Sequence, residues 1–244
     1  MSKIIHIISD LHLVESQPHL LNLFTHYIQK IAPESECLYV LGDLFEVWVG
    51  DDNHTNFNQQ VIDLFAEYSR HGQLFFAHGN RDFLLGHQFA KACGGELIDE
   101  PHLLDWAGQT ICMMHGDALC TDDVAYQQLR NTVRSEQWQQ QFLSQTVSKR
   151  LEIADGIRAK SKDAQQNKNT EIMDVNAQAV FDCFKSNQCQ WLIHGHTHRE
   201  GRHMVDMGDN NTVERVVLSD WAEQGHYLSL KNSQVQSHFF DLEN

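Results

Sequence analysis

The strongest constraint in this sequence is a repeated arrangement in which a short apolar run ends in glycine, histidine, aspartate or asparagine. Runs that are rich in β-branched and aromatic residues and are bounded by turn residues are typical of buried strands. Five of them stand out: KIIHIIS (3–9), CLYVLG (37–42), QLFFAHG (73–79), TICMMHG (110–116) and WLIHG (191–195). The chain is therefore expected to contain buried strands whose carboxyl ends are polar.

Helical patterns separate several of these strands. Apolar residues recur at helical spacing over residues 20–31 and again over 61–68. Strands that alternate with helices predict a layered α/β domain. The carboxyl-terminal segments 203–207, 213–221, 225–231 and 235–242 are instead typical of a β meander with polar turns.

Residue types that bind metal ions or phosphate follow the five runs directly, in the segments Asp10-Leu-His12, Gly42-Asp43, Gly79-Asn80-Arg81-Asp82, His115-Gly116 and His194-Gly-His196-Thr-His198. Ligand sites of open α/β sheets lie beyond the carboxyl ends of the strands, so these segments are expected to converge on one crevice. In an extended chain, the two members of Asp10-x-His12 and of His196-x-His198 would point to the same side and could grip one ion. The glycines at positions 42, 79, 116 and 195 would let the backbone pass close to a compact site.

The histidine-rich segment HGHTH has two interpretations, a polar turn and a metal site. The shared placement of all five segments favours the metal site. His194 faces away from His196 in an extended chain, so it is expected to be a hydrogen-bonded core residue. Structural or orienting roles without contact to an ion are expected for His6, His78, His226, Asp82 and Asp117.

Residues 122–168 interrupt the alternation of strands and helices. They are rich in Gln, Ser, Lys and Arg, and their apolar residues recur at helical spacing at Trp138, Phe142, Val147, Leu151 and Ala154. We expect a helical insertion into a core formed by residues 1–121 and 169–244, and residues 160–170 have the composition of a mobile loop. The insertion holds eight of the eighteen basic residues and six of the thirty-three acidic ones, which gives it a charge of +2. It is either a solvated helical face or a lid that meets an anionic ligand or bilayer surface.

Composition narrows the partners and the compartment. The formal charge of −15 disfavours nucleic acid as a partner, because binding its backbone demands clustered Lys and Arg. The six cysteines are scattered and form no CxxC pair, which indicates a reducing compartment. The apolar run in MSKIIHIISDLHL is too short for a signal peptide or a membrane span. We therefore expect a protein of the cytoplasm or of a membrane surface that faces it.

The motifs SDLHL, GDLFEVWVGDD, GNRDF, MHGD and HGHTH resemble those of the calcineurin-like metallophosphoesterase superfamily, whose pattern is D-x-H, G-D, G-N-H-D/E, H and G-H-x-H. The resemblance spans residues 9–198 and implies an α/β fold of the αββα sandwich type. Within the superfamily, GDLFEVWVGDD, Arg81, HGDALCTDD and IMDVN are similar to members that cleave a UDP-linked diacylglucosamine lipid in lipid A synthesis.

The resemblance also implies two divalent metal ions, Mn²⁺ in this family. One ion would be held by Asp10, His12, Asp43 and His198, and the other by Asp43, Asn80, His115 and His196, so that Asp43 bridges both. Imidazole, carboxylate and amide ligands suit Mn²⁺, Fe²⁺ or Zn²⁺, and the residue types alone do not choose among these ions. The implied substrate contacts are Asn80, Arg81, Asp123, Ser161, Gln165, Lys168 and His196, with Gln165 in place of the usual Asn.

Arg81 departs from the superfamily pattern, because this position is usually a histidine that contacts phosphate and protonates the leaving group. Arginine does not release a proton at neutral pH, but its planar guanidinium can hold two phosphate oxygens. A site without that acid favours a leaving group that departs readily as an anion, such as a phosphate monoester from a diphosphate. Arg81 therefore indicates pyrophosphate cleavage.

Together these features predict a hydrolase in which a hydroxide activated by two metal ions attacks the diphosphate of a UDP-linked diacylglucosamine, releasing UMP and 2,3-diacylglucosamine 1-phosphate. A diacylated substrate places the enzyme peripherally on the cytoplasmic side of the inner membrane. One alternative is a general nucleotide or cyclic-nucleotide phosphodiesterase. The other is a metal-binding scaffold without catalysis, although such scaffolds lack some ligands and all seven are present here.

Overall fold

The computed structural model describes residues 3–166 and 174–242, without the side chains of residues 160–166. One sheet contains β1 (Ile5–Ile8), β2 (Cys37–Leu41), β3 (Gln73–Ala77), β4 (Glu96–Leu97), β10 (Gly225–Lys231) and β11 (Gln234–Phe240). The other contains β5 (His102–Trp106), β6 (Gln109–Met114), β7 (Trp191–His194), β8 (Gly201–Asp206) and β9 (Thr212–Val217). The strand orders are β11-β10-β1-β2-β3-β4 and β5-β6-β7-β9-β8.

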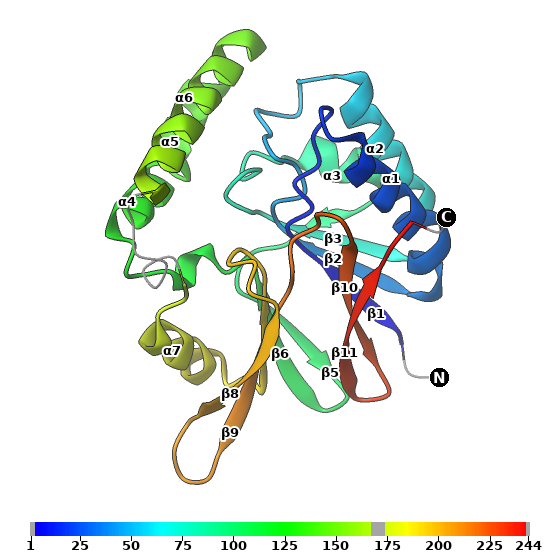
Figure 1. Ribbon diagram of the computed structural model, residues 1–244, viewed down its shortest axis with the longest axis vertical. Helices are drawn as coiled ribbons and strands as arrows, with labels where there is room; N and C mark the ends of the chain where they lie inside the picture. Colours follow the sequence, from blue (N-terminus) through cyan, green and yellow to red (C-terminus); the bar gives the residue numbers. More distant parts are fainter. Residues whose placement is uncertain (1–2, 167–173, 243–244) are drawn as a thin grey trace.

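The two sheets pack against each other, and helices cover their outer faces (Figure 1). Strand β2 shows why. Its residues Cys37, Tyr39 and Leu41 enter the apolar layer between the sheets, whereas Leu38 and Val40 pack under helices. Both faces are buried, so the strand is apolar at every position. This arrangement confirms the predicted αββα sandwich.

The outer helices are short and amphipathic. Helices α1 (Pro18–His26), α2 (Asn56–Tyr68) and α3 (His87–Cys93) cover the first sheet, and α7 (Ala177–Asn187) covers the second. Helix α1 continues into a π-helical turn (Tyr27–Ile31) and a 3₁₀ turn (Ala32–Glu34), and a second 3₁₀ turn (Asp117–Leu119) follows β6. The rings of Phe24 and Phe65, from α1 and α2, lie 4.9 Å apart over the first sheet.

The five predicted strands lie in the parallel parts of the two sheets. Strands β1, β2 and β3 pair in parallel, as do β6, β7 and β9. The prediction of one carboxyl-terminal meander is wrong, because β8 and β9 join the second sheet whereas β10 and β11 join the first. The chain crosses between the sheets after β9, where the Trp221 amide donates to the Asp10 carbonyl at 3.0 Å.

Helices α4 (Val124–Val133), α5 (Glu136–Leu143) and α6 (Val147–Gln166) follow the second 3₁₀ turn and project to one side of the sandwich (Figure 1). The mobile loop predicted for 160–170 is wrong for residues 160–166, which continue α6; residues 167–170 lie outside the described part. The reason is that 157–166 contain mostly good helix formers and neither glycine nor proline. Leu151 is 37% exposed, so it does not belong to the apolar face that contains Trp138 and Phe142.

Candidate active site and metal centre

The loops at the carboxyl ends of β1, β2, β3, β6 and β7 bring all seven predicted metal ligands together. The predicted extended geometry is wrong, because Asp10, His12, His196 and His198 have φ values of 57°, 49°, 68° and 55°. Asp43 is also left-handed, with φ of 49°. The ligands therefore converge through tight left-handed turns and not through the alternation of a strand.

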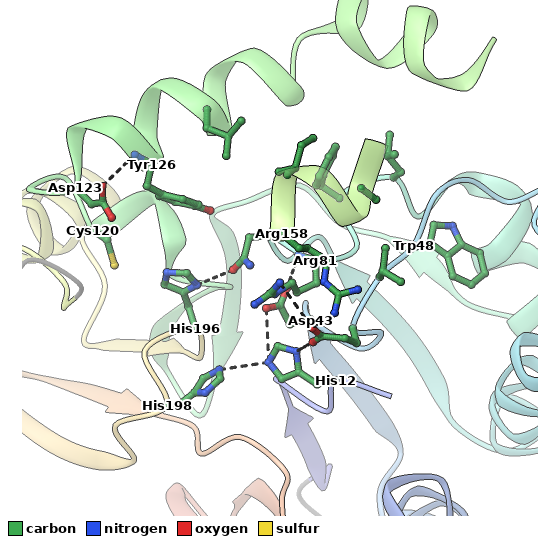
Figure 2. A pocket seen from close by; sticks show the side chains of 18 of the residues that line it. His12, Asp43, Trp48, Arg81, Cys120, Asp123, Tyr126, Arg158, His196 and His198 are labelled. Atoms are coloured by element: carbon green, nitrogen blue, oxygen red, sulfur yellow. Dashed lines mark hydrogen bonds and ion pairs between the residues drawn. The ribbon is translucent and has the colours of Figure 1, made fainter. Parts of the chain in front are cut away.

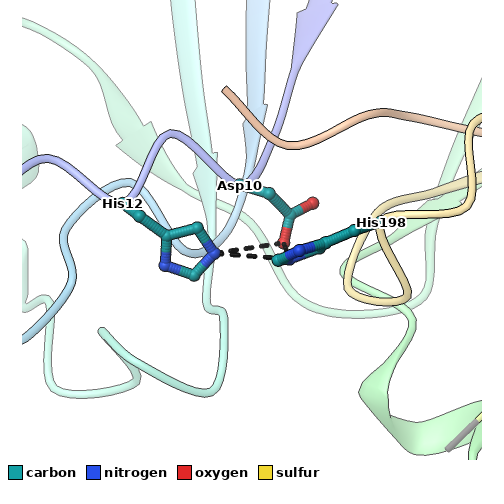
Figure 3. Close-up of side chains that lie close together, drawn as sticks. All are labelled: Asp10, His12 and His198. Atoms are coloured by element: carbon teal, nitrogen blue, oxygen red, sulfur yellow. Dashed lines mark hydrogen bonds and ion pairs between the residues drawn. The ribbon is translucent and has the colours of Figure 1, made fainter. Parts of the chain in front are cut away.

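One group of ligand atoms joins the loops after β1 and β7 (Figure 3). His198 Nε2 lies 3.3 Å from Asp10 Oδ1 and 3.4 Å from His12 Nε2, which is itself 3.8 Å from Asp43 Oδ2. Ligand atoms about 2.1 Å from one ion stand between about 3 Å apart, for adjacent ligands, and about 4.2 Å apart, for opposite ones. The group therefore has the size of a single-ion site.

A second group adjoins the first on the other side of Asp43. Asn80 Oδ1 lies 3.0 Å from His115 Nε2 and 2.8 Å from His196 Nδ1. Asp43 Oδ1 lies 3.7 Å from His115 Nε2, while its Oδ2 faces His12 in the first group. Asp43 thus presents one carboxylate oxygen to each group, as a bridging ligand would.

The donor set fits divalent cations. Asp10 Oδ1 is buried, and no donor among the described residues reaches it with hydrogen-bond geometry. A buried carboxylate oxygen left in this state is costly unless a cation pairs with it. Two glycines leave the space that the aspartates occupy. A Cβ on Gly195 would stand 2.0 Å from Asp10 Oδ2, and one on Gly79 would stand 2.1 Å from the Asp43 amide nitrogen, so a side chain at either position would collide with an aspartate.

Hydrogen bonds orient the imidazole rings. His12 Nδ1 donates to Glu46 at 3.0 Å, His115 Nδ1 donates to the Leu41 carbonyl at 2.9 Å, and His198 Nδ1 lies 3.4 Å from Asp220. In each case Nε2 faces the ligand groups, where it can bind an ion once it carries no proton. The sequence analysis missed Glu46 and Asp220. Glu46 carries a signal in the motif GDLFE, whereas Asp220 lies in the crossing segment and carries none.

Charge in the site shifts the histidine pKa values in opposite directions. Burial lowers the pKa of His115, but Asp43, Asp10 and neighbouring acids outweigh it and raise the pKa to about 9. Burial also lowers the pKa of His198, but the adjacent Asp10 and Asp220 carboxylates outweigh it and raise the pKa to about 10. For His196, burial and the nearby His115 lower the pKa to about 4. The clustered carboxylates thus attract positive charge.

The residues expected to stay away from an ion have other partners. His194 donates from Nδ1 to the Gly195 carbonyl at 2.8 Å, and Arg215 lies 3.1 Å from its Nε2. Asp82 accepts the amides of Gly79, Asp43 and Leu44, and thereby fastens two ligand loops together. The remaining partners are Leu85 O for His78, Tyr27 and Glu34 for His6, Ser219 and Ser237 for His226, and Tyr126, Arg130 and Arg134 for Asp117.

A cavity of about 380 Å³ opens over the two groups and extends under the helical segment (Figure 2). Its polar end is lined by predicted ligands, among them Asn80, and by two further predicted substrate contacts, Arg81 and Asp123. Its other end is apolar and is lined by Val47, Trp48, Phe83, Leu84, Leu129, Trp138, Phe142, Ala154 and Ile157. Ser161 and Gln165 lie on α6 with side chains outside the description, and Lys168 lies outside the described residues.

A family model described as calcineurin-like phosphoesterase matches residues 4–200. The chain belongs to this family. Proteins named UDP-2,3-diacylglucosamine hydrolase are similar to it along most of their length. The one from Tolumonas auensis is 42% identical over 230 residues, 93% of each chain. The one from Haemophilus influenzae strain PittGG is 43% identical over 95% of each chain. The one from Aromatoleum aromaticum is also 43% identical, over 91% of this chain and 90% of the relative. The predicted family and the predicted class, a metal-dependent hydrolase, are confirmed.

Two clusters attach the helical segment to the phosphoesterase sandwich. Arg150 of α6 is only 1% exposed; it donates to the Val49 carbonyl at 2.6 Å and pairs with both oxygens of Asp52. Asp117 accepts from Tyr126 and Arg130 of α4 at 2.7 and 2.8 Å. The sequence analysis assigned no role to Arg150, because a buried arginine in a polar helix has no local signature. Among the described helices of this phosphoesterase, none is both long and apolar enough to cross a bilayer.

Proposed function

We propose that this phosphoesterase hydrolyses the diphosphate of UDP-2,3-diacylglucosamine to UMP and 2,3-diacylglucosamine 1-phosphate, a reaction of lipid A synthesis. The observation that carries the proposal is a cavity that joins two groups of potential cation ligands to an apolar wall. A substrate with a charged diphosphate and two acyl chains needs both ends. The names of the relatives at 42–43% identity support the same substrate.

Seven residues would hold two divalent ions, for which we propose Mn²⁺: Asp10, His12, Asp43, Asn80, His115, His196 and His198. When bound, such a pair of ions activates water and neutralises charge on the reacting phosphoryl group. The protein holds the ligand rings in the tautomer that leaves a nitrogen free, through Leu41, Glu46 and Asp220. Water adds across one P–O bond of the diphosphate, and the other phosphate leaves as a monoester.

Arg81 is proposed to bind the diphosphate. Its backbone amide donates to Asp43 Oδ1 at 2.7 Å, so the residue is fixed to the bridging ligand, and its side chain lines the cavity. The guanidinium can hold phosphate oxygens while the reaction builds negative charge on them. Further substrate contacts are proposed for Asn80, Asp123, Ser161, Gln165, Lys168 and His196.

The apolar wall is proposed to hold the acyl chains. The rings of Trp138 and Phe142 stack at 4.7 Å, and both residues line the cavity together with Ile157 of α6. Residues 122–168 would then act as a lid over the lipid. Because the substrate resides in a bilayer, we also propose peripheral association with the cytoplasmic face of the inner membrane.

A comparison of substrates tests this function. Turnover of UDP-2,3-diacylglucosamine is expected to exceed that of bis(p-nitrophenyl) phosphate and cyclic AMP, to disappear in EDTA, and to return with Mn²⁺. A preference for the two smaller esters would instead favour a general phosphodiesterase. Turnover that survives EDTA would contradict the role of the ions.

The variant Arg81→His tests the argument about the leaving group. It restores the general acid that is usual in the superfamily but removes the planar fork. We expect turnover of the UDP-lipid to fall by about tenfold or more. Equal turnover of the diphosphate by both forms would refute the argument.

A further inference from the structure

Glu46 connects the proposed metal centre to the helical segment. Its carboxylate follows β2 by five positions and has a side chain that is 22% exposed. Oε2 accepts from His12 Nδ1 at 3.0 Å, and Oε1 accepts from Arg158 Nη2 at 2.9 Å. Arg158 belongs to α6 and is 112 residues further along the chain. Figure 2 shows Arg158 and Arg81 beside His12, at the polar end of the cavity.

The two carboxylate oxygens of Glu46 bind different partners. The bond to Nδ1 selects the His12 tautomer whose Nε2 lone pair faces the first ligand group. The bond to Arg158 holds α6 against the sandwich at the mouth of the cavity. Arg81 Nη1 lies 3.7 Å from the same Oε1, so the carboxylate also offsets two neighbouring guanidinium charges.

We propose that Glu46 is a positioning residue through which metal binding and docking of α6 reinforce each other. An ion on His12 Nε2 makes the Nδ1–H a stronger donor and immobilises Glu46, so the ordered carboxylate is ready for Arg158. Conversely, Arg158 holds Glu46 where it orients His12 for the ion. The coupling is reciprocal, so each event favours the other by the same factor. This inference rests on the proposed metal site and goes beyond the proposed reaction.

Mn²⁺ binding to the full chain, followed by the electron paramagnetic resonance signal of free Mn²⁺, measures one side of the coupling. Glu46→Gln cannot accept the Nδ1–H while it also accepts from Arg158, and we expect its Mn²⁺ affinity to fall about tenfold or more. Arg158→Met is expected to lower the affinity about three- to tenfold although Arg158 touches no proposed ligand. The double variant should bind Mn²⁺ no more weakly than Glu46→Gln, because both changes break one link.

Hydrogen exchange of residues 147–158 measures the other side. Mn²⁺ is expected to slow this exchange in the wild-type protein and to leave it unchanged in both variants. Lys149→Met is the matched control, because Lys149 lies on the same helix and its ion pair with Glu152 is exposed; it should behave as the wild type does.

Two results would overturn the inference: wild-type Mn²⁺ affinity in Arg158→Met, or losses in the two single variants that simply add in the double variant. A wild-type protein that binds no Mn²⁺ would overturn the proposed function itself and remove the basis of the coupling.

Discussion

At the scale of single residues, the centre is built from unusual backbone conformations. Five of the seven proposed ligands are left-handed residues other than glycine. Each such conformation costs on the order of 1 kcal/mol or more and persists only where the surroundings impose it. Here the His12 amide donates to the Asp43 carbonyl at 2.9 Å, and the His196 amide donates to Asp10 Oδ2 at 3.0 Å. The ligand loops thus hold one another in place before an ion arrives.

Substitution of two buried histidines, His115 and His194, distinguishes a proposed metal ligand from a structural residue. His115→Ala is expected to lower turnover by about 100-fold or more and to remove one metal ion per chain. His194→Ala removes the partner of Arg215 and the Gly195 carbonyl, so we expect it to lower the free energy of unfolding by about 2–4 kcal/mol. Metal analysis of the purified proteins should still find two ions in the His194 variant. Loss of an ion there would mean that His194 supports the centre directly.

The raised histidine pKa values predict proton release on metal binding. His115 and His198, with pKa values of about 9 and 10, are protonated at pH 7 in the metal-free protein. Their charge stabilises that form fully below about pH 6.5, and the contribution is lost as the pH rises through 9 and 10. An ion must displace these protons, so Mn²⁺ affinity should rise from pH 6.5 to 9.

Calorimetry in buffers of different ionisation enthalpy measures that release, which is expected to be one to two protons per chain at pH 7. Binding that releases no protons at this pH would contradict the raised pKa values.

At the scale of elements, the helical segment is tied to the sandwich at both ends. Helix α4 is held by Asp117, which follows the proposed ligand His115 by two residues. Helix α6 is held by the ion pair of its Arg150 with Asp52, which lies eleven residues after the end of β2, in the loop that also contains Asp43. The loops that carry the proposed metal ligands therefore also position the wall of the cavity, so a substitution in one of these loops should also alter the wall.

Arg150→Met tests the attachment of α6. The change removes the bonds to the Val49 carbonyl and to Asp52, whose own side chain is 62% exposed and can be solvated again. We expect a decrease of about 1–3 kcal/mol in the free energy of unfolding, measured by urea denaturation, and a higher KM for the lipid. The neighbouring Lys149→Met, which breaks only an exposed pair, should change stability by less than about 0.5 kcal/mol. Equal effects of the two variants would contradict the role of Arg150.

At the scale of the whole molecule, the topology of the sheets gathers acidic side chains at one edge of the sandwich. The chain carries a net charge of −15, and several of its carboxylates are buried together beyond the ends of parallel strands. Such a cluster repels a diphosphate unless cations neutralise it. Bound ions would therefore contribute to the stability of this fold as well as to its chemistry.

Removal of the ions should accordingly lower the thermal stability of the entire protein. Mn²⁺ at about 100 times its dissociation constant is expected to stabilise the folded state by about 2.7 kcal/mol for each site, and EDTA should reverse the effect. Asp43→Asn removes the proposed bridging charge and should abolish most of this gain. Calorimetry measures the melting temperature with Mn²⁺ and with EDTA. A melting temperature that changes with neither Mn²⁺ nor EDTA would argue against a bound pair of ions.

Some of this protein could be predicted because the signal is local. Strands β1, β2, β3, β6 and β7 are short apolar runs, and burial on both faces follows from their composition alone. The proposed ligands His12, Asp43 and His115 could be predicted because each lies at or shortly after the end of such a run. The parallel arrangement of the strands then makes their ends meet, which is a property of the sheet and not of any single residue.

Other features were decided only by tertiary structure, because they depend on residues that are distant in the chain. Nothing near Glu46 or Arg158 indicates that they meet, and nothing near Arg150 indicates that it is buried. The carboxyl-terminal strands look alike in sequence, yet packing assigns β9 to one sheet and β10 to the other. Sequence determined which chemical groups the centre contains, and the folded backbone, through left-handed turns and long-range hydrogen bonds, decided how they are oriented.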